Sequence, residues 1–164
     1  AGSFSKVLSP GMRVGYAIAP KEIIAKMTVC KQTEDVHTNI WAQAVANEFM
    51  CKYDFEGHLA KIRKIYKHKA ELMQGLLDEK VCPNVSYNKV QGGLFIWAEL
   101  PEKFNMLDVV KKAVEHKVAV VPGTAFLNDE SAETNSFRLN FSTPTDEQIV
   151  KGIDILASVL NSMN

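Results

Sequence analysis

The sequence predicts an α/β or α+β sandwich in which helices pack on a small sheet. Three observations support this prediction. Two long helical stretches occupy the first half, and from residue 86 onward short strand-like and helical segments are joined by short connections. Apolar residues make up 46% and charged residues 23%, which is typical of a globular protein. The 164 residues are enough for one compact domain with a core.

The first half contains a loop, a short strand and the long helices. Residues 1–20 are predicted to form a loop that carries Lys6, followed by a strand over 13–19 that ends at Pro20. A helical pattern begins at Glu22, loosens over 32–37 and restarts after Thr38, the predicted N-cap. The apolar face of this restarted helix is Ile40, Trp41, Ala44, Val45 and Phe49. A second helix is predicted over 56–79, with one face in the core.

The second half changes from helical to strand-like periodicity. Strands are predicted over 85–87, 93–100 and 118–121, with an amphipathic helix over 106–116 between the last two. Residues 137–142 alternate apolar and polar side chains, which predicts a half-buried strand with Phe137 and Leu139 on the buried face. Thr145 and Gln148 form a capping box that starts the final helix.

Composition excludes several classes of function. Basic and acidic residues balance at 19 each, so there is no global electrostatic reason to expect nucleic acid or an anionic membrane. No apolar run approaches the ~20 residues that span a bilayer, and no signal peptide is evident. Cys30, Cys51 and Cys82 lack metal spacing and are predicted to be reduced, partly buried thiols in a cytoplasmic protein. Trp41 and Trp97 are predicted to pack in the core.

Lys6 and Arg13 are the first candidates for chemistry. A lysine amine attacks a carbonyl only when it is neutral, and a nearby cation or desolvation favours that state. Arg13 offers five fixed donors suited to a phosphate, and the hydroxyls of Ser3 and Ser5 could add hydrogen bonds. Exposed lysines and arginines are the rule, however, so the pair by itself predicts a solvated loop.

Arg138 is the second candidate. Its side chain is expected on the strand face opposite Phe137 and Leu139. One use of such an arginine is a bidentate clamp on a carboxylate. The commoner use is pairing with a surface acid, and the strand pattern alone favours that use.

Taken together, several segments resemble class I/II aminotransferases, the fold-type I enzymes that depend on pyridoxal 5'-phosphate. Residues 2–6 (GSFSK) with 9–16 (SPGMRVGY) resemble the family's Schiff-base signature. Later landmarks follow in the family's order, namely Asn39 with Gln43, His58 with Arg63 and Tyr66, 91–97 (QGGLFIW), 121–123 (VPG) with Phe126, and 137–142 (FRLNFS). The resemblance covers essentially the whole chain and is strongest to the 2-aminoadipate or kynurenine aminotransferase-like branch, which also occurs in MocR-type regulators.

The resemblance implies a role for each candidate residue. Lys6 would form the Schiff base with the cofactor and later move the proton. Ser3, Ser5 and Arg13 would hold the cofactor phosphate, and Arg138 would bind the α-carboxylate of the substrate. The implied reaction transfers an amino group between an amino acid and a 2-oxo acid. The resemblance also implies a homodimer for the full-length parent, with neither nucleic acid nor membrane bound through this segment.

The resemblance further implies the C-terminal portion of the fold-type I fold, with helices on a small mixed sheet. Residues 1–20 would be trailing strands of the large cofactor-binding domain, 21–55 an interdomain helical segment, and 56–164 the small α/β domain. Such a fragment alone is expected to have little or no activity. Two alternatives stay open: an effector-binding domain of a MocR-type transcription regulator, and a lyase or decarboxylating transferase on the same scaffold.

Overall fold

The computed structural model describes residues 1–129 and 132–163, and the chain divides into two compact units, Ala1–Arg63 and Lys64–Asn164. The boundary falls inside the helix α3 (Phe55–Lys80), which was predicted over 56–79. The predicted domain limits at residues 20 and 55 concern the complete protein and stay predictions.

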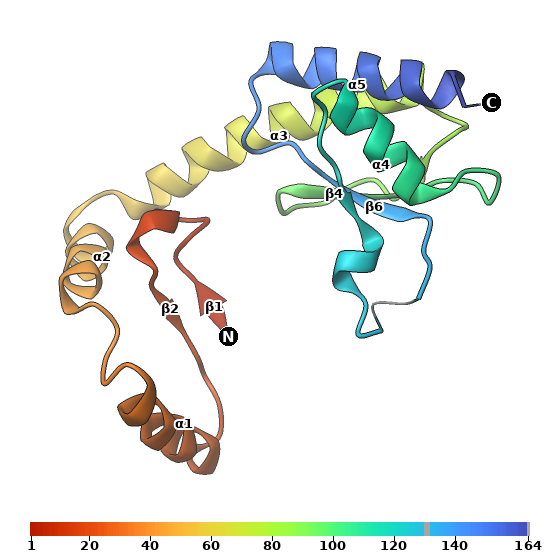
Figure 1. Ribbon diagram of the computed structural model, residues 1–164. Helices are drawn as coiled ribbons and strands as arrows, with labels where there is room; N and C mark the ends of the chain where they lie inside the picture. Colours follow the sequence, from red (N-terminus) through yellow and green to blue (C-terminus); the bar gives the residue numbers. More distant parts are fainter. Residues whose placement is uncertain (130–131, 164) are drawn as a thin grey trace. The chain divides into compact units, whose positions relative to one another are not determined.

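The first unit begins with a two-stranded antiparallel ribbon (Figure 1). Its elements are β1 (Gly2–Ser3), the 3-10 turn η1 (Pro10–Met12), β2 (Gly15–Tyr16), α1 (Lys21–Glu34), α2 (Ile40–Lys52) and the first turns of α3. The strand predicted over 13–19 contracts to β2, because its partner β1 is only two residues long. Backbone that has no neighbour to pair with does not extend the ladder.

The N-terminus of α2 is capped one residue later than predicted. Asn39, rather than Thr38, is the N-cap, and its side-chain Oδ1 accepts a hydrogen bond from the Ala42 amide at 3.2 Å. Asparagine and threonine are both favoured N-caps, so the sequence pattern alone could not choose between adjacent candidates.

The apolar face predicted for α2 is largely exposed within this chain. Ile40 is 68%, Trp41 75% and Val45 41% exposed, whereas Ala42 and Ala46 are buried. The prediction that Trp41 packs in the core is therefore wrong within this chain. The buried positions of α2 are thus the two small residues and not the large apolar ones.

The second unit contains a four-stranded sheet in the order β3-β4-β6-β5. The strands are β3 (Ser86–Tyr87), β4 (Phe95–Glu99), β5 (Val121–Pro122) and β6 (Ser136–Asn140). Every pair in the described part of this sheet is antiparallel, where a mixed sheet was expected. The strand predicted over 118–121 shortens to β5, because only Val121 and Pro122 pair with β6.

Three helices cover one face of this sheet, namely the C-terminal part of α3, α4 (Met106–Glu115) and α5 (Asp146–Asn161) (Figure 1). Phe137 and Leu139 of β6 are buried on that face at 0% and 6% exposure, as their alternation predicts. The predicted capping box is present, with Thr145 and Gln148 exchanging backbone and side-chain hydrogen bonds. The fold class predicted from the sequence is thereby confirmed in its helices and its small sheet.

Two further predictions concern Trp97 and the cysteines. Trp97 is 47% exposed and lies outside the core, because it occupies the face of β4 opposite the buried Ile96 and Ala98. The cysteines are free as predicted, but Cys30 and Cys51 are exposed and only Cys82 is partly buried. Within 1–129 and 132–163, no cluster of side chains could hold a metal ion, and no helix has the length and apolarity to cross a membrane.

Candidate functional site

The β1–β2 ribbon requires glycine at two positions to form the loop that carries Lys6. Gly2 pairs with Tyr16 and Ser3 pairs with Gly15. A Cβ on Gly15 would lie 2.8 Å from the Gly2 carbonyl oxygen, and a Cβ on Gly2 would collide with the Tyr16 ring. The two glycines therefore let the strands approach closely, while Phe4 packs on Tyr16 with ring centroids 5.7 Å apart.

Lys6 lies in the turn that leaves β1. The Leu8 amide donates to the Phe4 carbonyl at 2.9 Å, which closes the turn, and the Phe4 amide donates to the Val14 carbonyl at 3.0 Å, which ties it to the other arm of the ribbon. Lys6 itself is exposed, and its amine has no hydrogen-bond or ion-pair partner among the described residues. The turn thus presents an amine with which no described side chain pairs.

Ser3 and Ser5 are linked through the same turn. The Ser5 amide donates to Ser3 Oγ at 3.1 Å. Because a hydroxyl both accepts and donates, this bond leaves the Ser3 proton available to an anion. Ser3 is exposed and Ser5 half-buried, so a ligand could reach both residues.

Arg13 ends η1 in the left-handed backbone conformation, with φ 54° and ψ 41°. Its Nη1 donates to the Pro10 carbonyl at 3.0 Å, and the side chain has no acidic partner in the described part of the chain. One donor of the guanidinium is therefore used and the others remain available. Lys6 and Arg13 are the only charged side chains in residues 1–20, so the ribbon has a positive field suited to an anion.

Arg138 is half-buried on the face of β6 opposite Phe137 and Leu139, as predicted from the alternation of its neighbours. Its cross-strand neighbours are Trp97 on β4 and Val121 on β5. The guanidinium carbon lies 4.1 Å from the centre of the Phe95 ring and 4.8 Å from that of Phe126. Both distances are within the range of cation–π attraction.

The polar atoms of Arg138 are not fully satisfied. Its Nε is buried and has no hydrogen-bond partner within the described residues, and no described acid pairs with the guanidinium. A buried donor without a partner is uncommon in folded proteins and calls for an explanation, such as a ligand. The surface-acid pairing that the strand pattern favoured is therefore not what this arginine makes.

Sequence analysis did not assign the aromatic residues around Arg138 to the site. Phe95 and Trp97 share its face of the sheet, and Phe126 packs edge-on against Trp97 with centroids 5.3 Å apart. Gly123 permits this arrangement, because a Cβ there would lie 2.7 Å from the Ser136 carbonyl oxygen. The β4–β6 register decides which aromatics meet the arginine, and a single sequence does not reveal that register.

The predicted residues thus fall into two groups. Ser3, Ser5, Lys6 and Arg13 lie together on the β1–β2 ribbon of the first unit, and Arg138 lies on the sheet of the second.

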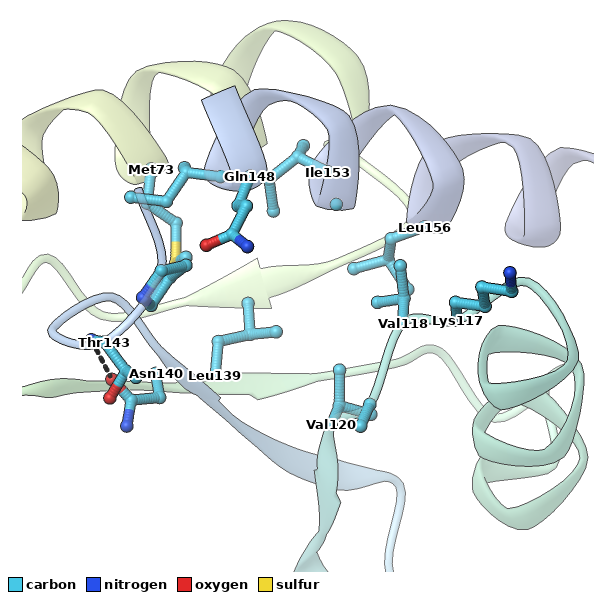
Figure 2. Close-up of a pocket in the computed structure, with 14 residues that line it drawn as sticks. Met73, Lys117, Val118, Val120, Leu139, Asn140, Thr143, Gln148, Ile153 and Leu156 are labelled. Atoms are coloured by element: carbon cyan, nitrogen blue, oxygen red, sulfur yellow. Dashed lines mark hydrogen bonds between the residues drawn. The ribbon is translucent and has the colours of Figure 1, made fainter. Parts of the chain in front are cut away.

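A cavity of about 300 Å³ lies in the second unit between β6 and α5 (Figure 2). Leu139, Ile153 and Leu156 contribute to its apolar lining, and Gln148 and Thr143 supply polar groups. Leu139 points to the helix-covered face of β6, whereas Arg138 occupies the opposite face. None of the predicted site residues lines this cavity, so it is separate from the candidate site.

Comparison with known proteins shows the family of the chain. The family model for aminotransferase class I and II matches residues 1–156. The 2-aminoadipate transaminase of Thermus thermophilus is 38% identical over 162 residues, which are 99% of this chain and 40% of that protein. The crystal structure of LysN, the alpha-aminoadipate aminotransferase from Thermus thermophilus complexed with N-(5'-phosphopyridoxyl)-L-leucine, gives a TM-score of 0.92 at 36% identity, covering 99% of this chain and 41% of that one.

The chain therefore spans about 40% of the length of these relatives. A more distant match is the HTH-type transcriptional regulator YdfD of Bacillus subtilis, 26% identical over 162 residues, which are 99% of this chain and 33% of that protein. The family model and the more similar relatives agree with the resemblance seen in the motifs of the sequence. The chain belongs to the aminotransferase class I and II family.

Proposed function

We propose that the complete protein is a pyridoxal 5'-phosphate-dependent aminotransferase that moves an amino group between an amino acid and a 2-oxo acid. The observation on which this mainly rests is the family match over residues 1–156, which includes Lys6, Arg13 and Arg138. The relatives named 2-aminoadipate transaminase and alpha-aminoadipate aminotransferase favour substrates that carry two carboxylates.

Lys6 is the residue to which we assign covalent attachment and proton transfer. Its Nζ would bond to the cofactor's aldehyde carbon and, once released by the substrate, would move the proton taken from the substrate's α-carbon. The cofactor, when bound, supplies the electron sink for this reaction. The exposed, unpaired amine of Lys6 fits that role, because no other side chain in the described residues competes for it.

Ser3, Ser5 and Arg13 are the residues to which we assign the cofactor phosphate. Arg13 keeps unused guanidinium donors, and Ser3 keeps a hydroxyl proton. The absence of acidic side chains from residues 1–20 removes a competing negative charge. Charge-assisted hydrogen bonds of this kind are roughly twice as strong as neutral ones.

Arg138 is the residue to which we assign the substrate's α-carboxylate. Its guanidinium is held against two aromatic rings, and it lacks an acidic partner in the described residues. Its buried Nε has no hydrogen-bond partner there. A carboxylate would accept parallel hydrogen bonds from the two terminal nitrogens of the guanidinium.

The remaining assignments concern the complete protein. We infer a homodimer that acts in the cytoplasm on small amino and oxo acids, without nucleic acid bound through this segment. The activity belongs to the complete protein, and we expect residues 1–164 alone to show little or no turnover. That expectation fails if the 164-residue chain with added cofactor transfers amino groups.

Two variants of the complete protein test the assignment of roles. Lys6→Ala should abolish amino transfer from 2-aminoadipate to 2-oxoglutarate. Arg138→Gln should raise the substrate KM about 10- to 100-fold, since hydrogen bonds to charged groups contribute about 1.5–3 kcal/mol each. Turnover by Lys6→Ala at the wild-type rate would refute the proposal, and an unchanged KM in Arg138→Gln would remove Arg138 from the site.

A second candidate function is effector sensing in a MocR-type regulator. The observation that favours it is the match to YdfD, at lower identity than the match to the transaminase. A helix-turn-helix domain encoded ahead of these residues in the complete gene, together with sequence-specific DNA binding, would support the regulator over the enzyme.

A further inference from the structure

His58 makes a long-range contact with the Lys6 turn. Its Nε2 lies 3.0 Å from the carbonyl oxygen of Val7, the residue that follows Lys6. A carbonyl only accepts, so Nε2 must carry the proton and donate it. The bond joins residues 51 positions apart, both within the first unit.

The His58 ring is held by its surroundings. It packs edge-on against Phe49, with centroids 5.4 Å apart and planes at 86°. Phe49 in turn contacts the rings of Tyr53 and Phe55. An aromatic cluster of this kind restricts the ring to one orientation, which keeps Nε2 aimed at the carbonyl.

The backbone of His58 is fixed as well. The side chain of Asp54 accepts a hydrogen bond from the Gly57 amide at 2.9 Å, and the Asp54 carbonyl accepts from the His58 amide at 3.0 Å. A Cβ on Gly57 would collide with the Asp54 carboxylate. The start of α3 is therefore built tightly around Asp54, and His58 projects from its first turn.

The other hydrogen bonds of the turn act at its ends. The Leu8 and Ser9 amides donate to the Phe4 carbonyl, and the Phe4 amide donates to Val14. Lys6 lies between these anchor points, and the bond from His58 holds the peptide group that directly follows Val7. Without it, the middle of the turn would keep more conformational freedom, and ordering it on reaction would carry an entropic cost.

We propose that His58 is a positioning residue for Lys6. By holding the Val7 carbonyl, it fixes the turn from which the Lys6 amine reaches the cofactor. The inference rests on the proposed function, which identifies the group that Lys6 binds as the cofactor. The tether itself is a property of this chain and can be measured without the cofactor.

The experiment compares three variants of the complete protein with the wild type. His58→Phe keeps an aromatic ring against Phe49 and removes the donor, whereas His58→Gln keeps a donor at similar reach. His68→Phe is the matched control, because His68 lies ten residues later on the same helix and contacts the exposed Asp146.

The first readout is hydrogen exchange of residues 4–9 in protein free of cofactor. His58→Phe should speed exchange of the Leu8 amide about two- to tenfold, the equivalent of one hydrogen bond. His58→Gln should recover part of the protection, and His68→Phe should match the wild type. Exchange of Leu8 at the wild-type rate in His58→Phe would overturn the proposal.

The second readout is the visible absorbance of pyridoxal 5'-phosphate bound to Lys6, titrated against pH. Bonding of the Lys6 nitrogen to the aldehyde carbon would release water as C=N replaces C=O, and the pKa of the bonded nitrogen would depend on its placement. His58→Phe should shift that pKa and slow attachment about two- to tenfold. A lowered melting temperature with neither property changed would show a purely structural role and overturn the proposal.

The two readouts separate this inference from the proposed function. If the wild type takes up no cofactor on Lys6, the proposed function fails, and the inference that His58 positions Lys6 for that cofactor fails with it. The exchange of Leu8 would still report the tether. If the wild type takes up cofactor normally and His58→Phe matches it in both readouts, only the role of His58 is refuted.

Discussion

Replacing Phe126 by Leu should weaken carboxylate binding by removing one of the two aromatic faces on Arg138. The guanidinium carbon lies 4.8 Å from the centre of the Phe126 ring. Phe126 is 47% exposed, so the contact belongs to the weaker class of cation–π interactions, about 0.5–1 kcal/mol. Leucine keeps apolar volume at this surface position, so the change mainly removes the ring.

The magnitude of the effect follows from how the ring acts on the arginine. A free arginine side chain carries about 2 kcal/mol of rotamer entropy, part of which a ligand must offset when it orders the guanidinium. The Phe95 ring at 4.1 Å remains in the variant. Losing about 0.5–1 kcal/mol of ordering should raise the dissociation constant of a carboxylate about two- to fivefold.

The assay is calorimetric titration of the complete, cofactor-loaded protein with glutarate, a dicarboxylate that cannot react because it has no amino or oxo group. Phe126→Trp is the control, because it keeps an aromatic face. Wild-type affinity in Phe126→Leu, measured beside a clear loss in Arg138→Gln, would show that the ring has no part in placing the guanidinium.

Two further predictions concern stability. Thr145→Ala should lower the free energy of urea unfolding by about 1 kcal/mol, because it removes the α5 cap. The Thr145 hydroxyl also lowers the pKa of Glu147, so the wild type loses stability as pH falls through that pKa, and this loss should be smaller in the variant. An equal loss of stability at acid pH in both proteins would contradict this. Burial raises the pKa of Tyr87, and the hydrogen bond to Asp78 raises it further. The tyrosine of the unfolded chain ionises near pH ~10, whereas the folded one stays protonated there. The free energy of unfolding should therefore fall above that pH. Tyr87→Phe should lose about 1 kcal/mol at neutral pH and reduce the alkaline decline, to which the raised pKa values of Cys82 and Lys80 also contribute, and a decline of wild-type size would refute the reasoning.

Local signals in the sequence predicted the helical part of the fold well. The long helix α3 and the capping box at Thr145 depend on short-range periodicity and capping, and both appear within one residue of their predicted positions. The short strands were harder, because their length depends on a distant partner. Strand β5 ends where β6 stops pairing with it, at Val121 and Pro122.

The site was predicted unevenly for the same reason. Alternation along β6 placed Arg138 on the face opposite Phe137 and Leu139. The aromatic rings that flank it come from β4 and from the 3-10 turn η2 (Gly123–Phe126), and they meet it only through register and the close approach at Gly123. His58 carried no signal of its contact with Val7, 51 residues away. For Trp41 the sequence predicted burial that the structure does not show. An apolar helical face does not reveal whether residues 1–164 alone cover it.

The most direct test of the central claim is chemical mapping of the lysine that binds the cofactor. The complete protein is mixed with pyridoxal 5'-phosphate, reduced with borohydride, digested and analysed by mass spectrometry. We expect a pyridoxyl group on Lys6 in the wild type and none at that position in Lys6→Ala. A pyridoxyl group found on another lysine, with Lys6 unmodified, would contradict it.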